Sequence, residues 1–206
     1  VSHHDPKIVS CCGAVYGGMA LICSNRLQPG KIDHTYGGQL SAGLAACHPR
    51  YTKEDDATTN GNNKEYPLHQ REFEELFQST SVPIAYENSI LAGRWRKSLW
   101  NIPFNGISVS MGGLTVDKIV TDPGLRQLAY DLMDETVSAA NKDLQSQRLG
   151  DKFFLGETDK DKMMYLSDTM GAYRTSTMLD YISGRPMEVK YLFRKPMERA
   201  QELGVP

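Results

Sequence analysis

The hydrophobic pattern of this 206-residue chain changes near residue 88, and this change constrains the fold more than any other feature. Before it, short apolar runs alternate with turn residues, which is typical of strands. After it, apolar residues recur every three or four positions, which is typical of helices. We therefore expect an α/β segment over residues 1–88 and a mainly helical domain over residues 89–206.

The first segment is predicted to hold several strands and one helix. Gly37–Gly38 and the LQPGK run at 27–31 both resemble turns, and we assign the hairpin turn between the second and third strands to Gly37–Gly38. Pro83 predicts an edge strand because it cannot donate a backbone hydrogen bond. The expected strands are 14–24, 31–36, 39–45 and 82–87, the expected helix is 69–79, and residues 47–66 form a mobile polar loop.

The second segment is predicted to hold helices only. One contains residues 95–105, and Gly112–Gly113 separate it from the next. Asp122 as N-cap and Pro123 in the first turn predict a helix over 121–144. The remaining expectations are a polar loop and one helix between 156 and Gly184, and a last helix from Pro186 towards Leu203 with a kink at Pro196.

Composition excludes several partners. The formal net charge is −2 with no basic stripe, which disfavours nucleic acid and anionic membranes, and no run of apolar residues is long enough to span a bilayer. The four cysteines have no CxxC spacing, which indicates reduced thiols in a cytoplasmic protein. A metal site is not expected, although His3, His4, Cys47 and His48 are potential ligands.

The segment WRKSLWNIPFN, residues 95–105, carries an unusual polar stripe. Lys97, Asn101 and Asn105 recur every fourth residue along an otherwise apolar helix, and Pro103 removes one donor and frees the carbonyl of Leu99. In a purely structural interpretation, the lysine ammonium extends to water. The two asparagine side chains then form hydrogen bonds with unpaired backbone groups at helix ends or with a neighbouring helix. Because asparagine is a poor helix former, the stripe equally suggests a functional site.

A second group of polar residues lies near the end of the chain. Ser176 and Asp180 are four residues apart, and Glu188 follows Pro186. A solvated helix face explains the first pair more simply, and a carboxylate near a helix start complements the helix dipole. The whole sequence has no GxGxxG or GxxxxGK[ST] run, so it contains no phosphate-binding turn of these types.

Together these segments resemble the ketopantoate reductase (2-dehydropantoate 2-reductase) family. The resemblance rests on WRKSLWNIPFNGISVSMGGLTVDKI at 95–119, YRTSTMLDYISGRPMEVKYL at 173–192 and RAQELGVP at 199–206, with the run at 15–45 resembling the last strands of a Rossmann domain. It implies an NADPH-dependent reduction of ketopantoate to pantoate, in pantothenate and coenzyme A synthesis. It also implies that residues 1–88 are the remnant of a Rossmann-like domain, joined to a helical domain with the active site between them.

The resemblance assigns roles by position. Lys97 matches the family's proton-donating lysine, Asn101, Asn105 and Ser176 match substrate-binding residues, and Glu188 matches an acidic residue that contacts the cofactor. A lysine on a rigid helix can polarise a ketone and protonate the resulting alkoxide, and we expect partial burial to lower its pKa. Thr115 and Tyr173 stand where some members have substrate-binding asparagine.

The resemblance also leads to expectations about the activity and assembly of this chain. Family members begin with a GxGxxG turn upstream and continue past ELGVP into a final helix, so we expect the 206-residue chain alone to be inactive. A homodimer through the helical domain is a further expectation. The alternatives are another 2-ketoacid reductase of the same superfamily, or a non-catalytic helical dimerisation module.

Overall fold

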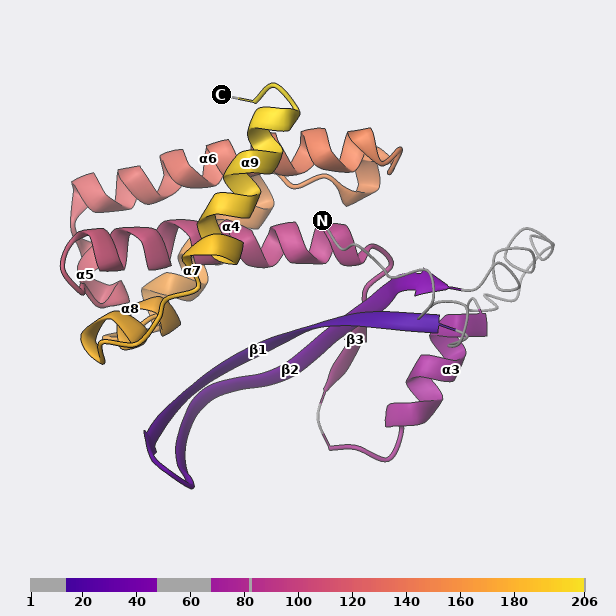
Figure 1. Cartoon of the computed structure of the whole chain (residues 1–206), viewed down its shortest axis with the longest axis horizontal. Coiled ribbons are helices and arrows are strands. Elements are labelled where there is room, and N and C mark those ends of the chain that lie inside the picture. Colours follow the sequence, from indigo (N-terminus) through magenta and orange to yellow (C-terminus); the bar gives the residue numbers. More distant parts are fainter. Residues whose placement is uncertain (1–13, 48–67, 82, 206) are drawn as a thin grey trace. The chain divides into compact units, whose positions relative to one another are not determined.

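A computed structural model describes residues 14–47, 68–81 and 83–205. The chain divides into two compact units, Val1–Gly93 and Arg94–Pro206, which are described separately. The first contains a three-stranded sheet and one helix, and the second is helical (Figure 1). This is the predicted class, a Rossmann-like remnant followed by a helical domain.

A long antiparallel hairpin dominates the first unit. Strands β1 (Ala14–Gln28) and β2 (Lys31–Cys47) pair along their length. Their turn is at Pro29–Gly30, inside the predicted LQPGK turn, and Gly30 has a φ of 77°. Gly37 and Gly38 lie within β2, so the second hairpin turn predicted there was wrong. Leu21 pairs with Gln39 and the next residue with Gly37, which leaves Gly38 (φ 122°) as the extra residue of a β-bulge. One strand therefore replaces the two predicted at 31–36 and 39–45.

The sheet is completed by a short parallel strand. Strand β3 (Ile84–Tyr86) pairs with Leu40–Ala42 of β2 and is an edge of the described sheet, as Pro83 predicted. Helix α3 (Leu68–Phe77) precedes it and buries Phe73 against the rings of Tyr16 and Tyr86. The loop predicted at 47–66 lies almost wholly outside the described residues.

The second unit is built around α4 (Ile90–Ser110), which begins at the end of the first unit and continues through Pro103 without a break. Its core includes Leu99 and Phe104 of α4, Met133 and Leu144 of α6 (Pro123–Ser146), and Met164 of α7 (Glu157–Thr169). Helix α9 (Lys195–Glu202) packs against α6, and its residues line one hollow with Trp95 and Ile102 of α4 (Figure 1). The other elements are α5 (Val116–Thr121), α6 (Pro123–Ser146), a 3-10 turn (Asp151–Phe153), α7 (Glu157–Thr169), α8 (Ser176–Ile182), a π-helical segment η2 (Lys190–Arg194) and α9 (Lys195–Glu202).

Some of the predicted helix boundaries were correct and others were not. The Asp122 side chain accepts a hydrogen bond from the backbone N–H of Leu125 at 2.9 Å, which confirms the predicted cap of α6. The glycines at 112 and 113 form the predicted turn after α4, both with positive φ. The polar loop predicted after residue 156 was wrong, because these residues begin α7. There the Asp159 carboxylate accepts from the backbone N–H of Gly156.

The end of the chain also differs from the prediction. Residues 170–175 separate α7 from α8, so two helices occupy the region where one was expected. Residues 185–188 are not helical, and the last helical run begins after Glu188 rather than at Pro186. The kink expected at Pro196 stays a prediction. Pro196 lies in the first turn of α9, directly after a π-helical turn in which the N–H of Lys195 donates to the carbonyl of Lys190. In the described part of the chain, no helix combines the length and apolarity that a bilayer crossing requires.

Candidate active site

Three polar side chains of α4, five residues apart, hold this helix against three others. The indole N–H of Trp95 donates to Asp143 of α6 at 3.0 Å, and that of Trp100 donates to Ser167 of α7 at 2.9 Å. The Asn105 carboxamide oxygen accepts from the backbone N–H of Thr177 in α8 at 3.1 Å. Because five residues turn a helix through about 140°, these side chains point in three directions. The polar stripe therefore lies on a helix fixed from several sides.

Asn105 is the buried end of the predicted stripe, with 1% of its surface exposed. Its amide nitrogen donates to the backbone carbonyl of Asn101 at 3.0 Å, while its oxygen accepts from Thr177. Thr177 follows Ser176 directly, so this contact fixes the start of α8 beside α4. The structure thus brings Asn105 and Ser176, predicted from distant segments, into one neighbourhood.

Lys97 and Asn101 lie nearer the surface. Lys97 is exposed on the helical unit and Asn101 is half-buried, so the partial burial expected for the lysine is not found. Ser176 is also exposed, as the first residue of α8. An ammonium, a carboxamide and a hydroxyl in reach of solvent are groups that can bind a small polar molecule.

Asp180 and Glu188 differ in their surroundings. The Asp180 carboxylate forms an ion pair with Arg185 at 3.0 Å, which supports the simpler interpretation of that residue. Glu188 is exposed, and its backbone carbonyl accepts from the N–H of Leu192. The next residue, Val189, lines an apolar hollow of about 420 Å³ together with Trp95. Glu188 and Lys97 are therefore close in sequence to Val189 and Trp95, two residues that line the same hollow.

The two positions that depart from the family pattern have structural roles. Thr115 precedes α5, and its hydroxyl donates to the Asp117 carboxylate, which lowers the pKa of Asp117. The ring of Tyr173 lies beside that of Trp100, with 6.1 Å between centroids. Its carbonyl accepts from the N–H of Val116 at 3.0 Å. Tyr173 therefore connects the turn before α8 to α5, and Thr115 stabilises the start of α5.

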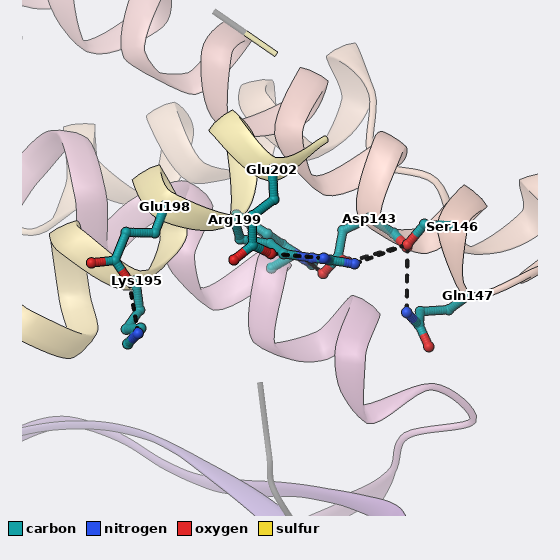
Figure 2. A network of polar contacts seen from close by, with 8 residues as sticks. Asp143, Ser146, Gln147, Lys195, Glu198, Arg199 and Glu202 are labelled. Atoms are coloured by element: carbon teal, nitrogen blue, oxygen red, sulfur yellow. Dashed lines mark hydrogen bonds and ion pairs between the residues drawn. The ribbon is translucent and has the colours of Figure 1, made fainter. Parts of the chain in front are cut away.

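Sequence reasoning missed the buried carboxylate of Asp143 (Figure 2). Its side chain is 8% exposed and forms an ion pair with Arg199 of α9 at 2.7 Å, in addition to its bond with Trp95. A signal was present, because Thr136, Ala139 and Asp143 recur at helical spacing on the buried face of α6. A carboxylate on such a face requires a cation or several donors.

Two further ion pairs hold the helices of this unit together. Arg126 binds Asp168 through two nitrogens at 2.6 and 3.0 Å, and this hydrogen bonding lowers the pKa of Asp168. Lys160 is 5% exposed and bonds to Asp134 and Glu157. Burial alone would lower the pKa of Lys160, but the two carboxylates outweigh it and raise the pKa.

Neither a metal site nor a dinucleotide site is evident in the described residues. There, no three His, Cys, Asp or Glu side chains are grouped to share a metal ion, and His3, His4 and His48 lie outside this range. A dinucleotide pyrophosphate binds where a strand leads through a glycine-rich turn into a helix. The whole sequence has no GxGxxG run, and β1 leads into a hairpin instead. These residues alone do not fit the pyrophosphate of a nicotinamide cofactor.

Comparison with known proteins gives consistent matches. Residues 89–206 match the family model described as "Ketopantoate reductase PanE/ApbA C terminal". The chain is 30% identical over 191 residues to a 2-dehydropantoate 2-reductase of Nostoc sp. (strain PCC 7120), covering 93% of this chain and 53% of the relative. The chain thus spans about half the length of that curated relative.

Solved structures agree in fold. The 2-dehydropantoate 2-reductase of Geobacter metallireducens GS-15 has a TM-score of 0.74 at 27% identity, over 98% of this chain and 60% of that one. A dimeric ketopantoate reductase from Staphylococcus aureus has a TM-score of 0.68 at 21% identity, over 93% and 56%. With the family model covering more than half of its residues, this chain belongs to the ketopantoate reductase family.

Proposed function

We propose that the protein containing this chain reduces 2-dehydropantoate to pantoate with NADPH, and that the helical unit supplies the proton donor and the substrate-binding groups. The observation that carries the proposal is the α4 stripe, whose buried member Asn105 bonds to α8 beside Ser176. The curated relatives at 30% and 34% identity are both 2-dehydropantoate 2-reductases, which supports this substrate.

The proposed roles follow from the chemistry of the reaction. As the ketone carbon of the substrate is reduced, its oxygen gains negative charge and then needs a proton. An exposed ammonium at Lys97 can polarise that oxygen and donate the proton. Asn101 and Ser176 would bind the hydroxyl and carboxylate of the substrate and orient its carbonyl. Asn105 would bind substrate at the buried end of the stripe, and Glu188 would contact the cofactor.

Specific observations bear on the alternatives. Another 2-ketoacid reductase would use the same lysine and differ in the groups that bind the rest of the substrate, so substrate profiling separates it. A non-catalytic dimerisation module would not need the exposed Lys97 and Ser176.

Self-association is compatible with catalysis, since the Staphylococcus aureus relative is dimeric. Met111, Leu128 and Met197 expose 50, 40 and 54% of their surface beside the apolar hollows of the helical unit, and we infer that a homodimer would form there.

The decisive experiment replaces Lys97 in the full-length protein. If Lys97 donates the proton, Lys97→Ala removes an interaction that strengthens as charge develops on the ketone oxygen. We expect kcat to fall by roughly 10²–10⁴-fold with little change in the KM for 2-dehydropantoate. Steady-state kinetics at saturating NADPH measure both constants.

Arg96→Ala is the matched control, since it removes a neighbouring cation that pairs with Asp159 at 3.6 Å. It should leave kcat near the parent value. If Lys97→Ala keeps a normal kcat and only raises KM, Lys97 binds substrate and the proposed proton donor is wrong. A parent protein that reduces other 2-ketoacids better than 2-dehydropantoate would favour the first alternative.

A further inference from the structure

One buried carboxylate joins the helix of Lys97 to the last helix of the chain. The Oδ2 atom of Asp143 accepts from the indole N–H of Trp95 at 3.0 Å. Its Oδ1 atom accepts from Nε of Arg199 at 2.8 Å and forms an ion pair with Nη2 at 2.7 Å. Figure 2 shows Asp143 on α6 facing Arg199 on α9. Each oxygen therefore holds a different helix.

The surroundings of Asp143 fix the geometry of both bonds. Its side chain is 8% exposed and that of Arg199 is 24% exposed, so water competes weakly for either group. The remaining nitrogens of the guanidinium are also occupied. Nη1 donates to Glu202 at 3.0 Å, and Nη2 also donates to Ser146 at 3.1 Å. Because all three nitrogens have acceptors, the guanidinium has a defined orientation.

The bond to Trp95 bears on the position of Lys97. Pro103 lacks an N–H, so the hydrogen-bond ladder of α4 has a gap opposite the carbonyl of Leu99. Asn105 anchors α4 beyond this gap, on its C-terminal side. Lys97 lies before the gap, two residues from Trp95. The bond between Trp95 and Asp143 therefore anchors the half of α4 that carries the lysine.

The bond to Arg199 bears on the segment after Glu188. Helix α9 follows the π-helical residues Lys190–Arg194, which are the irregular connection between Glu188 and the helix. Val189 and Trp95 line one hollow, and Ala200, next to Arg199, lines it too. A shift of α9 would therefore change the wall of the hollow nearest Glu188.

We propose that Asp143 is a positioning residue: through its two oxygens it sets the orientation of Trp95 and hence of Lys97, and ties the segment after Glu188 to the same point. The proposal rests on the proposed function, because it assigns Asp143 an effect on proton donation by Lys97. Asparagine has one acceptor oxygen and a donor amide. Asp143→Asn thus keeps the shape of the side chain but cannot accept from both Trp95 and Arg199.

The test is a double-mutant cycle in the full-length enzyme, with Asp143→Asn made in the parent and in Lys97→Ala. In the parent, kcat should fall about ten- to a hundredfold, since small misplacement of a catalytic group has effects of this size. In Lys97→Ala, the same substitution should change kcat less than about twofold, because no ammonium remains to be misplaced. Ser138→Ala, which removes an exposed hydroxyl of α6 that bonds to the Asp134 carbonyl and not to Asp143, Trp95 or Arg199, should keep the parent kcat.

A second measurement reports the geometry of the bond between Trp95 and Asp143 and does not depend on enzymatic activity. In protein with ¹⁵N-labelled tryptophan, the indole N–H resonance of Trp95, assigned by its loss in Trp95→Phe, should shift and exchange faster in Asp143→Asn. Equal losses of kcat in both backgrounds, or no loss in the parent, would overturn the proposal. If Asp143→Asn does not fold, Trp95→Phe replaces it in the cycle with the same expected and contradicting results. A normal kcat for Lys97→Ala would instead show that the proposed function itself had failed.

Discussion

At the residue scale, Asn105 shows both the reach and the limit of sequence reasoning. Its place in a polar stripe with Lys97 and Asn101 follows from four-residue spacing alone. Its main partner is a backbone N–H 72 residues away, at Thr177. No periodicity identifies such a partner, because the contact depends on how α4 and α8 pack. The side chain that the sequence marked as a ligand group is thus also a structural link.

Because Asn105 links α4 to α8, its replacement should change the free energy of unfolding. Asn105→Ala should lower the free energy of unfolding by about 1–3 kcal/mol, because the N–H of Thr177 loses its acceptor in a buried place. Urea unfolding of the full-length protein measures the change. Asn101→Ala is the control: Asn101 supplies only its backbone carbonyl to this contact, so the effect should stay within about 0.5 kcal/mol. Equal losses for the two variants would rule out the contact as the cause.

At the element scale, the local signal for the α6 cap was reliable and the signal for strand pairing at Gly37–Gly38 was not. The α6 cap involves residues three apart, Asp122 and Leu125, so the local sequence predicts it. The pair Gly37–Gly38 has the composition of a turn, but β1 extends past it and pairs on both sides. Whether two glycines form a turn or a bulge depends on the opposite strand, which the local sequence does not contain.

The sheet itself gives a prediction at this scale. A Cβ atom at Gly43 would lie 2.1 Å from the carbonyl oxygen of Glu87, the residue that follows β3. Gly43→Ala should therefore push β3 away from β2 and destabilise the protein by about 1–3 kcal/mol or more. Gly18→Ala is matched, since it lies on the paired strand and its Cβ would have ordinary contacts, the nearest at 3.5 Å. Thermal unfolding that affects both variants equally would contradict the close approach.

At the scale of the whole molecule, the order of strands and then helices was predicted because hydrophobic period is a local property. Membership of the family was predicted because two motifs, at 95–105 and 176–188, occur together. The network around Asp143 was not predicted, since it joins α4, α6 and α9 through side chains 48 and 56 residues apart. The sequence indicated which residues could react, and the packing of helices decides how they are held.

The last prediction concerns cofactor binding by the 206 residues alone. Tight binding of NADPH requires backbone N–H groups at a glycine-rich turn to meet the pyrophosphate, and no GxGxxG run occurs in this sequence. The side chain of Glu188 has no N–H group and cannot replace those donors toward a phosphate. We expect calorimetric titration of the 206-residue chain to give no micromolar binding of NADPH. The full-length protein, which must bind NADPH if the proposed function holds, serves as the positive control, and circular dichroism verifies that the chain is helical under the same conditions. Micromolar binding by the folded chain would show that its own residues form a dinucleotide site of another kind.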